Sequence, residues 1–116
     1  MDHWITAVNL RILIGESDHS HHHALHEEIV RQARKYGLDG ATVYRSITGY
    51  GHGRHIRTDK ILDLSSDLTV IIEIIDEEAK IKGFLPVLDE LMTAAHSGGL
   101  VVLQPVEIRR YFHHSS

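Results

Sequence analysis

The stretch that decides the fold is Leu68-Thr-Val-Ile-Ile-Glu-Ile-Ile-Asp76. It closes a longer region, residues 40–76, in which two β-branched runs flank a loop rich in Gly, His and Arg. Runs of β-branched residues favour strands. We therefore expect two strands joined by a functional loop. The more hydrophobic strand should lie at the centre of a sheet, because a strand that is apolar on both faces must be covered on both.

Strand and helix patterns alternate on either side of this region. Apolar residues recur every second position in the strand patterns and every three or four positions in the helical ones. Gly37 follows the first helical pattern, where a left-handed helix stop favours glycine. Pro86 should kink the second helix or begin its second half, and Pro105 indicates an edge strand. The expected order is strand Val8–Gly15, helix His21–Tyr36, strand Ala41–Thr48, strand Leu68–Asp76, helix Asp76–His96 and strand Leu100–Ile108.

This order, β-α-β-β-α-β, predicts an α+β ferredoxin-like sandwich, with two helices on one face of a four-stranded antiparallel sheet. At 116 residues we expect a single domain spanning 1–116, with its core at about 8–111. The chain has no cysteine, which excludes disulfides, and its net charge of −4 gives no pull toward nucleic acid. No segment reads as a membrane span or signal peptide, so we expect a cytoplasmic protein without direct membrane insertion.

Aliphatic side chains occupy both faces of the third and fourth expected strands. A sheet face that meets water would instead be polar. A monomer rarely exposes such an apolar patch, so the pattern predicts oligomerisation through the face that the helices leave open. Arg11 and Glu73 share that face by parity, and we expect them to pair there, with Arg45 joining them. The alternative to oligomerisation is a sheet face that is only partly exposed to water.

Five segments together resemble a PII-like family of unknown function within the PII (nitrogen-regulatory) signalling superfamily. The resemblance covers roughly residues 8–111. The segments are Leu10-Arg-Ile-Leu-Ile-Gly15, Gly37-Leu-Asp-Gly-Ala-Thr-Val43, Ile47-Thr-Gly-Tyr-Gly51, Leu64-Ser-Ser-Asp-Leu68 with Val70-Ile-Ile-Glu-Ile-Ile-Asp76, and Phe84-Leu-Pro-Val-Leu88.

The resemblance implies a homotrimer whose sheets pack toward a central axis. It also implies a sensor or adaptor rather than an enzyme. In PII proteins the loop between the second and third strands contacts a target, often a membrane transporter, and an adenine nucleotide binds in the clefts between subunits. Relatives in the closer family are often encoded beside fluoride-export channels. The implied partners are therefore the chain itself and a membrane transporter or ion channel.

A small anionic ligand is the binding partner that the loop residues favour. Glycines let main-chain N–H groups approach an anion, and arginines supply paired donors. The loop from Gly49 to Arg57 combines both residue types. The resemblance adds the turn before the last strand and the basic residues after it. The predicted ligand-binding residues are Gly49, Gly51, Gly53, Arg54, Arg57, Gly98, Gly99, Arg109 and Arg110.

Eleven histidines, several of them near the start of the first helix, leave a second hypothesis open. His22 and His26 would lie one helical turn apart, a spacing that can chelate zinc, nickel or copper. The alternative function is thus a divalent-metal-binding trimer, similar to the divalent-cation-tolerance proteins, with a site at His21, His22 and His26. The simpler interpretation is a solvated helix start. A third class is an interaction module without any ligand.

Overall fold

The computed structural model of the chain describes residues 3–50, 57–58 and 67–112. Its long elements are β1 (Ile5–Gly15), α1 (Leu25–Tyr36), β4 (Thr42–Arg45), β7 (Thr69–Asp76), α2 (Glu78–Ala94) and β8 (Leu100–Ile108). The short strands form two further pairs, β2 (His19–Ser20) with β3 (His23–Ala24) and β5 (Thr48–Gly49) with β6 (Arg57–Thr58).

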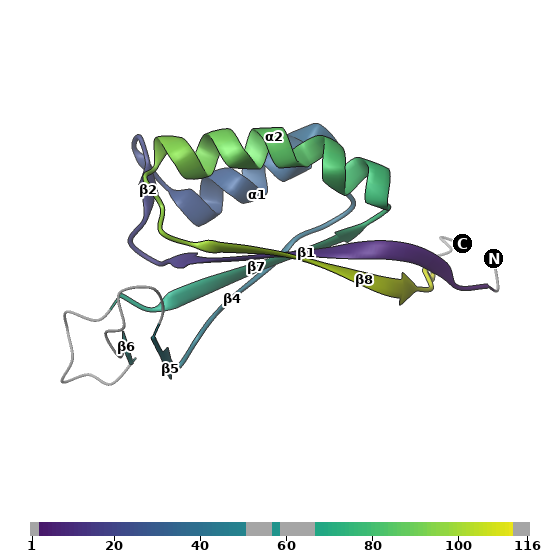
Figure 1. The fold of residues 1–116 in the computed structure, drawn as a ribbon, viewed down its shortest axis with the longest axis horizontal. Coiled ribbons are helices and arrows are strands. Elements are labelled where there is room, and N and C mark those ends of the chain that lie inside the picture. The colour runs from purple at the N-terminus through teal and green to yellow at the C-terminus, as the bar shows by residue number, and fades with distance from the viewer. Residues whose placement is uncertain (1–2, 51–56, 59–66, 113–116) are drawn as a thin grey trace.

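The long strands form one antiparallel sheet of four strands in the order β4-β7-β1-β8. β7 and β1 are the inner strands, and β4 and β8 are the edges. Both helices lie over the same face of the sheet and leave its other face open (Figure 1). The predicted ferredoxin-like βαββαβ sandwich is confirmed. The inner position of β7 and the edge position of β8, which contains Pro105, also agree with the prediction.

The hydrophobic core lies between the helices and the sheet. Alternate residues of β1 and β7 face the helices and are buried, and the strand register places them side by side. Burying one such side chain contributes about 1.5–3 kcal/mol, so this layer holds the helices on the sheet. The core includes Leu10, Ile12 and Ile14 of β1, Val70, Ile72 and Ile74 of β7, and Leu25, Ile29, Ile81, Phe84 and Leu88 of the helices.

The first helix ends as predicted but begins later than predicted. Gly37 has φ 101°, and its N–H donates to the carbonyl oxygens of Ala33 and Arg34 at 3.2 and 3.1 Å. At the other end, α1 starts at Leu25 rather than at His21. The residues before Leu25 form the β2–β3 hairpin, in which His21 has a left-handed φ of 58°. Local pairing within this hairpin takes the place of the first helical turn.

The second helix is a single element, and Pro86 lies inside it. Pro86 therefore does not divide the segment into two helices. The main-chain N–H of Glu77, just before the helix, donates to the carboxylate of Asp76 at 2.7 Å. No helix in the described part of the chain is long and apolar enough to cross a membrane.

The open face of the sheet carries an ion pair among apolar side chains. Nε of Arg11 donates to Oε2 of Glu73 at 2.9 Å, which confirms the predicted pair. Arg45 does not join them, because its register partner is Val70, on the helix-covered face, and it pairs with Glu16 at 3.1 Å instead. By the register, the apolar residues that share the face of Arg11 include Leu13, Ile71, Leu100 and Val102.

Candidate functional site

The base of the long loop between β4 and β7 is held by main-chain pairing. The N–H of Ser46 donates to the carbonyl oxygen of Thr69 at 2.9 Å, and the N–H of Thr69 donates to Oγ of Ser46 at 3.2 Å. Beyond them Gly49 pairs with Arg57, whose main chain alone is described. The sheet thus presents this part of the predicted site at the end of β4. Three further predicted residues lie outside the described residues, namely Gly51, Gly53 and Arg54.

The turn before β8 is braced by an aspartate. Oγ of Ser97 donates to Asp18 at 2.8 Å and accepts the N–H of Gly99 at 3.2 Å. A Cβ at Gly99 would lie 2.4 Å from the carbonyl oxygen of Leu13, so close packing against β1 requires a glycine there. A Cβ at Gly98 would meet no atom within 4 Å. Of the two predicted glycines, Gly98 is therefore the one with open space beside it.

The two glycine segments lie at the same end of the sheet but at opposite edges. Gly49 continues from β4, Gly98 precedes β8, and the strands β7 and β1 lie between them. Neighbouring strands are about 4.8 Å apart, so three spacings separate the two edge strands by roughly 14 Å. A single copy of the chain does not bring them together.

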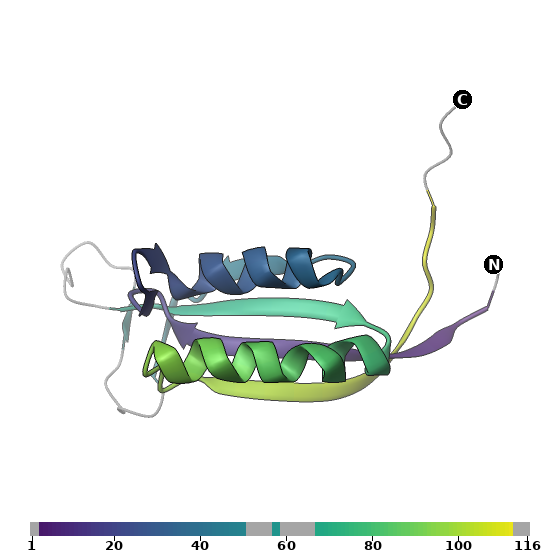
Figure 2. The ribbon, with the colours of Figure 1, turned by 90° about the horizontal axis from the view of Figure 1, so that it is seen from above.

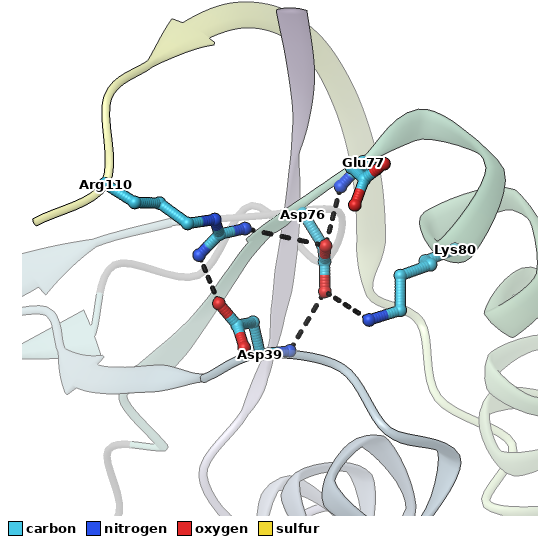
Figure 3. Close-up of polar contacts among 5 residues, drawn as sticks. All are labelled: Asp39, Asp76, Glu77, Lys80 and Arg110. Atoms are coloured by element: carbon cyan, nitrogen blue, oxygen red, sulfur yellow. Dashed lines mark hydrogen bonds and ion pairs between the residues drawn. The ribbon is translucent and has the colours of Figure 1, made fainter. Parts of the chain in front are cut away.

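Arg110 lies at the far end of the sheet and is held by two aspartates (Figure 3). Nη1 of Arg110 contacts the carboxylate of Asp39, and Nη2 lies 3.6 Å from Oδ1 of Asp76. The side chain of Asp76 is only 2% exposed. Its carboxylate also accepts the N–H groups of Asp39 at 3.0 Å and Glu77 at 2.7 Å, and it lies 3.7 Å from Nζ of Lys80. The charge of Arg110 is thus neutralised within the chain.

Sequence reasoning did not identify this cluster, which we call the aspartate node (Asp39, Asp76 and Arg110). Asp76 stands at the junction of a strand and a helix, where an acidic residue is ordinarily explained by the positive end of the helix dipole. A carboxylate at the end of an apolar strand can instead be buried, and it then needs partners. The neighbouring Arg109 places its guanidinium 5.3 Å from the ring centre of Tyr111.

The histidine cluster does not have the geometry that metal binding would need. His21 and His22 lie in the exposed turn between β2 and β3, whereas His26 lies in the first turn of α1. The one-turn helical spacing predicted for His22 and His26 is therefore absent. Within the described ranges, no group of three or more His, Asp or Glu side chains is placed to hold a metal ion.

Two open grooves flank the C-terminal half of α2. One, of about 740 Å³, lies between α2 and the start of β8 and includes Gly99, Met92 and Lys82 in its lining. The other, of about 810 Å³, lies between α2 and the β2–β3 hairpin and includes His21 and Asp89. Each groove has one cationic lining residue, Lys82 in the first and Arg31 in the second, and Asp89 lines both. The second groove is also lined by Glu28 and Glu90, so the first, which adjoins the predicted glycine turn, is the better suited of the two to an anion.

Glu73 is the carboxylate on the open face whose titration is perturbed. The hydrogen bond from Arg11 lowers the pKa of Glu73 below its ordinary value, and burial opposes this shift. Glu73 therefore stays charged at neutral pH and keeps the ion pair on the open face intact.

The sequence of the chain matches a protein family and several of its members. The model of the DUF190 family, described as "Uncharacterized ACR, COG1993", matches residues 7–108. A UPF0166 protein of Aquifex aeolicus is 41% identical over 99 residues, which cover 85% of this chain and 90% of the relative. A UPF0166 protein of Methanocaldococcus jannaschii is 35% identical over 99 residues, covering 85% of this chain and 88% of the relative.

Solved structures of PII-like proteins share the fold. CPII, a nitrogen regulatory PII-like protein from Thiomonas intermedia K12 solved with ADP, AMP and bicarbonate, matches with a TM-score of 0.69 and 15% identity, over 93% of this chain and 92% of that one. A putative PII-like signaling protein from Thermus thermophilus matches with a TM-score of 0.64 and 16% identity, over 90% of this chain and 91% of that one. At such low identity the likeness establishes the fold alone.

Proposed function

The chain belongs to the DUF190 family and has the PII-like fold, and from that premise we propose that it is a PII-like regulatory protein. It is a homotrimer and not an enzyme, and it binds a small anionic ligand, an adenine nucleotide, between its copies. The observation that carries this proposal is the placement of Gly49 and Gly98 at one end of the sheet but at opposite edges. A second copy placed edge to edge would complete the site.

The strand directions support such an edge-to-edge assembly. Every neighbouring pair in the sheet is antiparallel, so β4 and β8 run in opposite directions. In a ring whose axis is parallel to the strands, β4 of one copy lies antiparallel beside β8 of the next, so the two edges can continue the antiparallel ladder of the sheet. The same arrangement brings Gly49 of one copy beside Gly98 of its neighbour.

The open face supports the same assembly. In such a ring the helices face outward and the open faces of three sheets meet around the axis. Leu100 is 58% exposed in the single chain, and Leu13, Ile71 and Val102 share its face. Covering these side chains provides the hydrophobic driving force for assembly. The ion pair between Arg11 and Glu73 would lie among them.

We assign the ligand to the cleft formed by the loop base of one copy and the glycine turn of the next. Gly49, Gly98 and the loop residues up to Arg57 would contact its anionic group through main-chain N–H groups and guanidinium donors. CPII was solved with ADP and AMP, and this supports an adenine nucleotide here. Arg109 and Arg110 would not join this site, because β8 carries them to the opposite end of the sheet.

The ligand state would control the loop from Gly49 to about residue 63 and so its contact with a partner, a membrane transporter or ion channel. The protein would act in the cytoplasm as one domain spanning residues 1–116. Metal binding is not proposed as a second function, because no geometry in the described residues favours it.

Calorimetric titration with ATP, ADP and AMP tests the ligand. We expect at least one to bind and Gly98→Asp to weaken that binding roughly tenfold or more, because a carboxylate near the phosphates is repelled. Gly40→Asp is the matched control, since an added Cβ at either glycine meets no atom within 4 Å. It adds the same charge at the far end of the sheet. If no nucleotide binds, the protein is an interaction module without this ligand.

A further inference from the structure

The chain that follows β8, Arg109-Arg110-Tyr111-Phe112, carries two aromatic side chains that its own fold leaves uncovered. We call these residues the C-terminal arm. Tyr111 is 82% exposed and Phe112 is 66% exposed. A packed aromatic side chain buries about 150–250 Å² of surface, and clusters of exposed aromatic side chains mark interaction surfaces. The arm is therefore a candidate contact with another molecule.

Arg110 fixes the direction of the arm. β8 is one edge of the sheet, whereas Asp39 lies in the turn that leads into β4, the other edge. Arg110 reaches both Asp39 and Asp76, so the arm crosses the end of the sheet from the β8 edge toward the β4 edge. Figure 2 shows this segment leaving β8 and running past the ends of β1 and β7, away from the body of the protein.

A matching apolar side chain lies at the same end of the fold. Trp4, which is 60% exposed, directly precedes β1, and the next residue, Ile5, pairs with Ile108 at the end of β8. Trp4 continues the alternation of β1 with the parity of Val8, whose register partner is Asp76. Trp4 therefore lies toward the same side of the sheet as the aspartate node, but near the opposite edge.

We propose that the arm of one copy packs Tyr111 and Phe112 against Trp4 of the next copy. This inference rests on the ring proposed above, in which β8 of the next copy lies beside β4 of the first. The arm points past β4 and thus toward the neighbour's Trp4. A second copy is the occupant because the direction set by Arg110 continues the proposed edge contact. The arms and the ligand clefts lie at opposite ends of the ring.

The chain's single tryptophan makes this contact directly measurable. We expect the fluorescence of the assembled protein to show a buried Trp4, with emission at short wavelength and weak quenching by acrylamide. Phe112→Ser and Arg110→Met should each shift the emission to the red and raise quenching severalfold, without changing the mass by light scattering. Arg31→Met is the control, since it removes an ion pair with Glu28 on the outer surface of α1.

Mixed assemblies show whether the contact joins two copies. Trp4→Phe copies have no tryptophan fluorescence but keep an intact arm. Phe112→Ser copies keep Trp4 but lack one of the two aromatic side chains of the arm. When both are refolded together, the emission should return toward that of the unmodified protein, because arms of the first cover Trp4 of the second. An intact assembly with an exposed Trp4, or a mixture without recovery, would overturn the inference. A mass of 13.1 kDa for the unmodified protein would instead overturn the proposed assembly.

Discussion

Replacing Asp76 by alanine should destabilise the fold strongly, because its buried carboxylate has several partners. The change leaves the N–H groups of Asp39 and Glu77 without their acceptor. Each loss costs about 1–3 kcal/mol where water does not replace the bond. The contacts to Lys80 and Arg110, at 3.7 and 3.6 Å and half-exposed on the cationic side, add about 1 kcal/mol. The total is about 3–7 kcal/mol, and its lower part overlaps the roughly 3–5 kcal/mol that is lost when one partner of a buried ion pair is removed.

Urea unfolding at a fixed protein concentration measures this loss, because assembly makes stability depend on concentration. Asp89→Ala is the control. Asp89 is an exposed carboxylate of α2 for which no ion pair is found among the described residues, and its removal should change stability by at most about 0.5 kcal/mol. An Asp76→Ala protein within about 1 kcal/mol of the unmodified one would refute the reasoning. It would mean that water replaces the carboxylate at the node.

Two further predictions concern the open face and the glycine turn. The pKa of Glu73 is lowered in the folded state, so its pairing with Arg11 stabilises the fold above the unfolded pKa of about 4.3 and is lost as pH falls through the lower folded value. In Glu73→Gln the free energy of unfolding should fall less as the pH is lowered, by at most about 1 kcal/mol. An unchanged dependence on pH would contradict this. Gly99→Ala should cost about 1–3 kcal/mol in urea unfolding, because its Cβ would meet the carbonyl oxygen of Leu13. Gly98→Ala is its control, and equal effects of the two changes would count against the packing argument.

Most of the fold could be predicted because its signals are local. The alternation in β1 and β7 and the helical period ended by Gly37 each depend on neighbours within a few residues. The start of α1 was misplaced because residues 19–24 fit either a helical turn or a tight hairpin, and pairing between His19 and Ala24 favours the hairpin. Family membership was also predicted, since several weak segments in a fixed order are specific together.

The site was harder to predict because its contacts are distant in sequence or lie between copies. Arg110 was expected to be available for an anion, but its partner Asp39 lies 71 positions away. Arg45 was assigned to the wrong face because the register of β4 against β7 follows from the turn geometry, which a parity count does not see. Whether Gly49 and Gly98 share a ligand depends on a second chain, and one sequence does not specify its placement.

The sheet has four strands, each antiparallel to its neighbours, and this affects whether assembly stops at a closed ring. Head-to-tail joining of β4 to β8 satisfies strand direction for any number of copies, so direction alone does not stop growth at a ring. Closure must come from the twist of each sheet and from the buried open faces. A variant that flattened the sheet or made that face polar would risk open fibrils rather than harmless monomers.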